Sequence, residues 1–207
     1  MNIAVIAANG RSGKVFVEQA LAAGHSIRAG VHGKSELTTH ADLEIVQCDA
    51  TKKSEVENLI KGQDAVVSFI GHVKGSPAHV QTDAMRVLCT AMEHEGITRL
   101  ISLTGTGVRF PGDKISLIDR ILNTSIAVID PKRIQDGKDH VVLLQQSSLE
   151  WTVIRVLKLQ NIQPKSFSLK PGGPTKWVVG REEVAAAVLQ VIEQDSFIRQ
   201  APIISKV

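Results

Sequence analysis

Apolar runs alternate along the chain with segments of helical periodicity. The first run, at residues 3–6, contains no polar side chain, which is typical of a parallel strand buried on both faces. At 80–94, apolar residues recur at helical spacing instead. This alternation predicts an α/β fold, a single-domain Rossmann-type doubly wound parallel sheet flanked by helices. Strands are predicted at 3–6, 25–31, 43–47, 65–70, 99–103, 151–156 and 202–205.

Helical spacing predicts the connecting elements. One amphipathic helix follows the first strand up to residue 21, and others are predicted at 54–60, 80–94, 138–146 and 181–193. Residues 113–133 carry a further apolar helical face, interrupted around 123–125 and formed by Ile115, Leu117, Ile118, Ile121 and Leu122. No repeat or linker divides the sequence, so residues 1–207 are expected to form one domain.

The loop between the first strand and the first helix carries two glycines. Gly10 and Gly13 would let the backbone approach a phosphate and let the helix pack close to the strand. The free N–H groups at the start of the helix would face the anion. This pattern predicts a dinucleotide site, although a tight turn alone would also use two glycines. The loop residues predicted to hold the cofactor are Ala7, Asn9, Gly10, Arg11, Ser12 and Gly13.

The region after the second strand bears on which nicotinamide nucleotide binds. An NAD site places an acidic residue there for the ribose 2′-hydroxyl, whereas residues 31–33 contain no carboxylate and include His32, with Lys34 next. With Arg11, these two residues would suit a 2′-phosphate, so NADPH is expected to be preferred over NADH. The alternative is that all three are ordinary solvated basic residues.

Two further positions are candidates for contacts with the cofactor. Asp49 follows the third strand, where it would either accept a hydrogen bond from the adenine amine or cap the helix near Ser54. Gly71 follows the fourth strand, where it would either let the chain pass close to the ribose or end the strand in a plain turn.

Composition excludes several classes of function. The net charge of +3 is small and scattered, and only 3% of residues are aromatic, so the sequence does not indicate nucleic-acid binding. No apolar stretch is long enough to cross a membrane, and a cytoplasmic location is expected. Cys48 and Cys89 have no partner at metal-ligand spacing, so we predict free thiols and no metal site. The oligomeric state cannot be predicted from this sequence.

Four segments in order resemble the atypical short-chain dehydrogenase/reductases with NAD(P)H-binding, NmrA-like domains, a group that includes NADH-flavin and biliverdin-IX-beta reductases. They read AANGRSG at 7–13, RLISLTGTGV at 99–108, LEWTVIRV at 149–156 and GREEVAAAVL at 180–189. Together they span nearly the whole chain. The resemblance implies a Rossmann fold, an NAD(P) cofactor and oxidoreductase chemistry, with Arg11 where NADP-binding members often carry arginine.

Departures from the family pattern narrow that chemistry. Ala7 replaces the first glycine of the loop, Val156 replaces a proline, and Gly105 stands at the family's serine, between Thr104 and Thr106. The chain contains no tyrosine, which excludes the Tyr–Lys acid–base pair of the wider superfamily. Lys138 lies near the region of that lysine and is interpreted as a helix-surface residue.

An acceptor that is easily reduced needs no such tyrosine. We therefore expect an NADPH-dependent reductase of a small conjugated acceptor such as a flavin or a quinone. Thr104 and His72 are the candidate catalytic residues, with Thr104 also touching the cofactor and His72 as a proton donor. The acceptor pocket is expected at 72–77, 104–125 and 161–177, where Trp177 would either stack on a planar acceptor or pack under the loop.

The alternative hypothesis, from another functional class, is a non-catalytic, NADP(H)-binding redox sensor. The two hypotheses differ at residues 107–136, whose apolar face would turn inward over a catalytic pocket but outward on a partner-binding surface. A nucleotide-sugar epimerase is disfavoured by the missing tyrosine.

Overall fold

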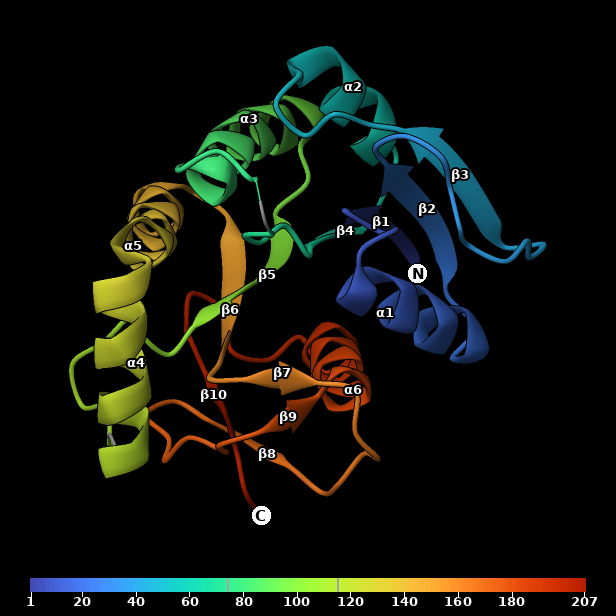
Figure 1. The fold of residues 1–207 in the computed structure, drawn as a ribbon. Helices are drawn as coiled ribbons and strands as arrows, with labels where there is room; N and C mark the ends of the chain where they lie inside the picture. The colour runs from blue at the N-terminus through green and yellow to red at the C-terminus, as the bar shows by residue number, and fades with distance from the viewer. Residues whose placement is uncertain (74, 115) are drawn as a thin grey trace.

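A mostly parallel sheet forms the central layer of the protein (Figure 1). The structure is a computed structural model that describes residues 1–73, 75–114 and 116–207. Within these residues the sheet has eight strands in the order β3-β2-β1-β4-β5-β6-β10-β8, and only β8 runs antiparallel to its neighbour. The strands are β1 (Asn2–Ile6), β2 (Ser26–Val31), β3 (Leu43–Gln47), β4 (Ala65–Ser68), β5 (Arg99–Gly105), β6 (Glu150–Val156), β8 (Ser168–Lys170) and β10 (Ile203–Ser205).

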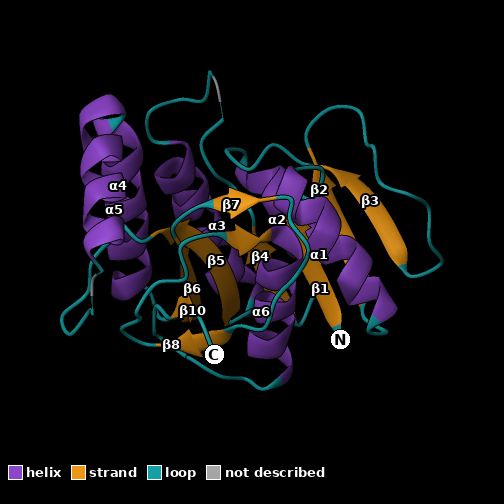
Figure 2. Ribbon diagram, turned by 60° about the horizontal axis from the view of Figure 1, so that its bottom comes forward, coloured by secondary structure: helices purple, strands orange, loops and turns teal. Residues whose placement is uncertain are grey.

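Helices cover both faces of this sheet. One apolar core packs against α1 (Arg11–Ala22) and α6 (Arg181–Glu193). The other packs against α2 (Lys53–Ile60), α3 (Val80–Glu95) and α5 (Pro131–Gln146). The remaining helix, α4 (Leu117–Ile129), lies beside α5 at one end of the sheet (Figure 2). The fold is therefore the single-domain Rossmann arrangement that the sequence predicts.

The strand order reverses at β1, which lies between β2 and β4. In an open parallel sheet, such a reversal leaves a crevice outside the carboxyl ends of the strands, and ligands bind there. The loop after β1, the loop after β4 and the ends of β5 and β6 therefore meet at one edge of the sheet.

The predicted elements agree with the structure where apolar spacing is regular, and differ around 123–138. The predicted interruption at 123–125 is wrong, because α4 runs unbroken through Asn123, whose amide donates to the Asp119 carbonyl (3.0 Å) and to Thr106 (3.1 Å). The helix predicted from 138 begins instead at Pro131, after Asp130 accepts a hydrogen bond from the backbone N–H of Arg133. Ile115 lies outside the described residues.

Short strands follow β6 that the sequence analysis did not predict. Besides β8, these are β7 (Leu159–Gln160) and β9 (Val179–Gly180), which pair with each other in a small second sheet. Two-residue strands carry too few positions for an apolar alternation to be recognised. They bring the chain after β6 back to the start of α6.

Candidate functional site

The loop after β1 presents unpaired N–H groups at the start of a helix. Gly10 is the N-cap of α1, and no side chain caps that end. The first N–H groups of an α-helix have no acceptor within the helix, so those of Arg11, Ser12 and Gly13 are free for a ligand. Together with the positive end of the helix dipole, they form a site for an anion.

Close packing explains the glycine at position 13. A Cβ there would lie 2.5 Å from the carbonyl oxygen of Ala7 and 2.7 Å from that of Ala8. Only glycine lets α1 approach the end of β1 so closely. Ala7, at the family's first glycine, keeps the left-handed backbone conformation that glycine favours, with φ of 60°. The loop geometry of a dinucleotide cradle is therefore present, at a cost of about 1 kcal/mol for the strained alanine.

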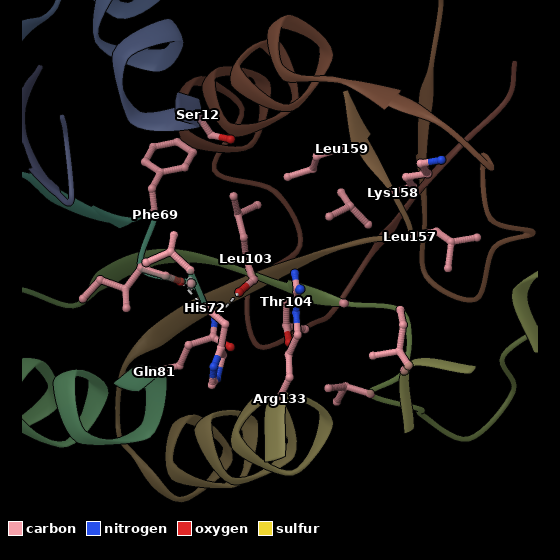
Figure 3. A pocket seen from close by; sticks show the side chains of 18 of the residues that line it. Ser12, Phe69, His72, Gln81, Leu103, Thr104, Arg133, Leu157, Lys158 and Leu159 are labelled. Carbon is pink, nitrogen blue, oxygen red and sulfur yellow. Dashed lines mark hydrogen bonds between the residues drawn. The ribbon is translucent and has the colours of Figure 1, made fainter. Parts of the chain in front are cut away.

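A cavity of about 480 Å³ opens beside this loop at the carboxyl ends of the strands (Figure 3). Its size is that of a small-molecule site. The loop after β1, the loop after β4, the end of β5 and the segment after β6 all line it. The lining residues are Gly10, Arg11, Ser12, Phe69, Ile70, Gly71, His72, Val73, Gln81, Leu103, Thr104, Gly105, Gly107, Val108, Asn123, Ile126, Arg133, Ile134, Val156, Leu157, Lys158, Leu159 and Arg181.

The charges around the cavity are all positive. Arg11, Arg133, Lys158 and Arg181 line it, and none of its described lining residues is an aspartate or a glutamate. Arg181 opens α6, is only 8% exposed, and has a buried Nε atom without a hydrogen-bond partner. Burial and the nearby charge of Arg11 lower the pKa of Arg181. Its Nη1 donates to Oδ1 of Asn161 (2.5 Å), so no carboxylate neutralises the guanidinium, and this favours an anionic ligand in the cavity.

The sequence analysis assigned no site role to Arg133, Lys158 or Arg181. Arg181 had one local signal, because it stands first in a helix whose N-terminus has no side-chain cap. Arg133 and Lys158 had none, because both are exposed cations, one on α5 and one in the loop after β6.

His32 and Lys34 lie elsewhere, at the end of β2. Both are exposed, and neither lines the cavity that includes Arg11. Asn9 holds this segment, donating to the carbonyl of Lys34 (3.0 Å) and accepting from the N–H of Glu36 (2.9 Å). Of the three predicted basic residues, Arg11 alone lines the cavity, and their joint contact with a 2′-phosphate stays a prediction.

Glu36 is a carboxylate that the sequence analysis did not consider at this end of the site. It forms an ion pair with Lys14, and the hydrogen bond from Lys14 lowers the pKa of Glu36. The negative charge of Glu36 would oppose a 2′-phosphate, and Lys14 partly neutralises it.

Asp49 is held in a turn of its own chain. Its Oδ1 accepts hydrogen bonds from the N–H (3.0 Å) and the hydroxyl (2.7 Å) of Thr51, and these bonds lower the pKa of Asp49. The N-cap of α2 is Lys52, without a side-chain hydrogen bond, so the predicted capping alternative is wrong. The adenine contact stays a prediction.

Gly71 lines the cavity, and a Cβ there would meet no atom within 4 Å. The tight approach at Gly13 is absent here, so the protein itself does not require a glycine at 71. A glycine at this position leaves room for a ligand, and the ribose contact stays a prediction.

His72 is one end of a buried polar network. Its Nε2 lies 2.7 Å from Oδ2 of Asp136, a fully buried carboxylate on α5. Asp136 also accepts hydrogen bonds from the N–H groups of Gln81 and Thr82 at the start of α3 and from the Thr82 hydroxyl (2.6 Å). Burial would raise the pKa of Asp136, but these hydrogen bonds outweigh it and lower the pKa. Asp136 is therefore a carboxylate, and it holds the His72 imidazole in place beside the cavity.

Thr104 lies at the end of β5, next to His72 in the cavity (Figure 3). A Cβ at Gly137 of α5 would lie 2.8 Å from the Thr104 hydroxyl, which shows how closely α5 approaches this side chain. Thr106 is fully buried and accepts from Asn123, so it is a structural residue.

The predicted pocket segments line the cavity only in part. Residues of 104–125 line the cavity, as do His72 and Val73, while Lys74 lies outside the described residues. No residue of 161–177 lines it, and the wall comes instead from 156–159 and Arg181. Trp177 is 51% exposed and does not line the cavity, so the predicted packing under the loop is wrong, while stacking on an acceptor stays a prediction.

Residues 107–136 turn most of their apolar side chains outward. Among the larger side chains of this part that the structure describes, those lining the cavity are Val108, Asn123, Ile126, Arg133 and Ile134. The inner face of α4 is polar, because Asp119 binds Arg109, Asn123 and Thr175 there. Its outer face exposes Leu117, Ile118, Ile121, Val128 and Ile129.

A second buried histidine in this region gives a pH prediction. His140 is bonded to Ser102 (3.0 Å), and burial lowers its pKa from 6.5 to about 4. Between these values the unfolded chain binds a proton that the folded protein excludes. The free energy of unfolding should therefore be highest above pH 6.5 and fall by about 3 kcal/mol toward pH 4.

Urea unfolding of the protein and of His140→Gln at several pH values measures this pH dependence of the free energy of unfolding. The variant should lose most of the slope between pH 6.5 and 4, whereas His79→Gln, at an exposed histidine, should keep it. An unchanged slope in His140→Gln would assign the pH dependence to other groups.

The part of the chain that the structure describes has neither a metal-binding cluster nor a membrane-spanning helix. No three or more of its His, Cys, Asp and Glu side chains are placed to hold a metal ion. None of its helices combines the length and the apolar character needed to span a membrane.

Comparison with known proteins agrees with this geometry. YwnB, an uncharacterized protein of Bacillus subtilis, is 27% identical over 156 residues, 74% of this chain and 70% of its own. A short-chain dehydrogenase/reductase of Veillonella parvula, solved in complex with NADP, shares the fold with a TM-score of 0.83 at 16% identity, covering 99% of this chain and 94% of its own.

A Streptococcus pneumoniae protein named "putative NADH-flavin reductase" superposes with a TM-score of 0.80 at 20% identity, covering 99% of this chain and 98% of its own. At these identities the solved structures show the fold alone. Residues 7–195 match the NAD(P)H-binding family, and this stretch includes the phosphate loop and all of the lining residues of the cavity. The chain therefore belongs to the NAD(P)H-binding family, with the fold of the short-chain dehydrogenase/reductases.

Proposed function

We propose that this protein is an NADPH-dependent reductase of a conjugated acceptor such as a flavin or a quinone. One observation carries the proposal: a single cavity is lined both by the phosphate loop and by Thr104 and His72 at the ends of the neighbouring strands. A dinucleotide with its pyrophosphate at Gly10–Ser12 would bring its nicotinamide toward these side chains. The name of the pneumococcal neighbour supports a flavin as the acceptor. The proposal includes a cytoplasmic location.

The bound cofactor would supply a hydride, so the acceptor gains two electrons and needs one proton to complete its reduction. With no tyrosine in the chain, His72 or water would deliver that proton. Asp136 would hold the imidazole in place and stabilise its protonated form, as a carboxylate does in a catalytic triad. Thr104 would contribute a hydroxyl beside the nicotinamide, and the apolar side chains of Leu103 and Leu159 would limit access of water.

Two measurements test the proposal. Titration of the purified protein with NADPH and NADH measures binding, and the loss of nicotinamide absorbance with flavin and quinone acceptors measures turnover. Binding with turnover on at least one acceptor is the expected result. If neither nucleotide binds, the proposal is wrong.

The preference for NADPH is assigned to the end of β2. Lys34→Ala should weaken NADPH binding about tenfold, the effect of losing one charge-assisted contact, and should leave NADH binding nearly unchanged. Arg11→Ala is the matched control, because Arg11 lines the main cavity and should affect both nucleotides equally. A selective loss of NADPH binding in Arg11→Ala, with none in Lys34→Ala, would move the 2′-phosphate contact to Arg11.

The exposed apolar face of α4 favours a second candidate function, an NADP(H)-binding regulator of the NmrA-like type. Side chains such as Val128 and Ile129, 79% and 83% exposed, are what a protein-binding surface presents. Tight NADPH binding without turnover on any acceptor would favour this regulator. Light scattering with and without NADPH would then show whether the nucleotide changes the assembly state.

A further inference from the structure

Positive charge reaches the cavity from four segments of the chain. Arg11 and Arg181 stand at the starts of α1 and α6, beside the loop proposed to hold the pyrophosphate. Arg133 comes from α5, and Lys158 comes from the segment between β6 and β7. Figure 3 shows Arg133 extending from its helix into the cavity, toward Thr104 and from the side opposite Ser12. The four cations thus line one cavity but come from different elements.

The charged ends of Arg133 and Lys158 are without protein partners. Among the described residues, no hydrogen bond or ion pair involves the guanidinium of Arg133 or the ammonium of Lys158, although the backbone N–H of Arg133 donates to Asp130, the N-cap of α5. Most other arginines are bound through their side chains to carboxylates or carbonyls, namely Arg28, Arg86, Arg99, Arg109, Arg155 and Arg199. The cavity also offers no acidic lining residue to neutralise these two cations.

The cofactor does not account for these two cations. Its negative charges are on phosphates, which the proposed function assigns to the start of α1 and the end of β2. The nicotinamide end, which would lie near Thr104, carries no negative charge. An arginine and a lysine that line the same cavity and lack partners are suited to a phosphate or carboxylate on a second ligand.

We propose that Arg133 and Lys158 form an acceptor subsite for an anion. The acceptor class is then a conjugated molecule that carries a phosphate or a carboxylate, as FMN does and riboflavin does not. This inference rests on the proposed reductase function, which it narrows from conjugated acceptors in general to anionic ones.

Steady-state oxidation of NADPH with matched acceptors tests the subsite. FMN against riboflavin measures the effect of a phosphate, and a carboxylated naphthoquinone against its uncharged parent measures that of a carboxylate. Arg133→Gln and Lys158→Gln should each raise KM for the anionic member of a pair about tenfold, with kcat nearly unchanged, and should leave the uncharged member unaffected. Lys138→Gln, an exposed lysine on α5 outside the cavity, is the matched control and should change neither.

Two results would overturn the subsite. One is equal KM values for the charged and uncharged members of both pairs in the unaltered protein. The other is an equal fall of kcat for both members in Arg133→Gln, because this would mean that the guanidinium stabilises charge arriving with the hydride rather than a fixed anion.

Failure of the proposed reductase function can be distinguished from failure of the anion subsite. If no acceptor is turned over, quenching of flavin fluorescence measures FMN binding to the protein saturated with NADP⁺. Binding that is stronger than for riboflavin and is lost in Arg133→Gln and Lys158→Gln supports the subsite without the reaction. FMN binding equal to that of riboflavin contradicts it.

Discussion

Gly13→Ala should destabilise the protein by about 2 kcal/mol, although alanine is the better helix former. In a helix interior, replacing glycine by alanine ordinarily stabilises by about 1 kcal/mol. Here the new Cβ would lie 2.5 Å from one backbone carbonyl oxygen and 2.7 Å from another, both in the loop that ends β1. Neither can move without displacing α1 from the sheet, so the steric cost exceeds the gain in helix propensity.

The same change should weaken NADPH binding by about tenfold or more, because displacement of α1 moves the N–H groups that face the phosphate. Urea unfolding measures the first effect and nucleotide titration the second. Gly105→Ala is the control for stability, since a Cβ there would be at ordinary contact distances of 3.9 and 4.0 Å. An unchanged unfolding midpoint in Gly13→Ala would mean that the loop tolerates a wider separation than the structure shows.

Arg155→Met should cost about 4 kcal/mol of stability. Arg155 is fully buried and binds both carboxylate oxygens of Asp113, at 2.5 and 2.8 Å. It also donates to the carbonyls of Val108, Pro171 and Ala201. A single side chain at the end of β6 thus joins the loop after β5, the segment after β8 and the approach to β10.

Much of that cost would come from the charge left behind. Burial alone would raise the pKa of Asp113, but the hydrogen bonds from Arg155 outweigh it and lower the pKa. Without the guanidinium, a nearly buried carboxylate loses its partner. Arg155→Met combined with Asp113→Leu should therefore be more stable than Arg155→Met alone.

Denaturant unfolding of both variants checks this, with Arg28→Met as the surface control. Arg28 pairs with the exposed Glu44 and should cost less than about 1 kcal/mol. A loss no larger in Arg155→Met than in Arg28→Met would show that the network stabilises little.

The elements that sequence alone predicted are those whose pattern is local. Residues 43–47 and 181–193 agree with β3 and α6 to the residue, because apolar periodicity reports a buried face without reference to the rest of the chain. The phosphate loop was predictable for the same reason, since strand, glycines and helix start lie within a few positions. The missing tyrosine was equally a property of sequence alone.

Tertiary structure decided everything that depends on distant partners. The apolar residues of 117–129 predict a helix correctly, but which face turns inward was set by Asp119, whose hydrogen bonds reach Arg109 and Thr175. His72 acquires its carboxylate from position 136, and the cationic cavity takes Arg11, Arg133, Lys158 and Arg181 from separate elements. Sequence therefore determined the fold and the cofactor loop, which short-range spacing encodes. The polarity of the acceptor site arises only when folding brings residues from four segments to one edge of the sheet.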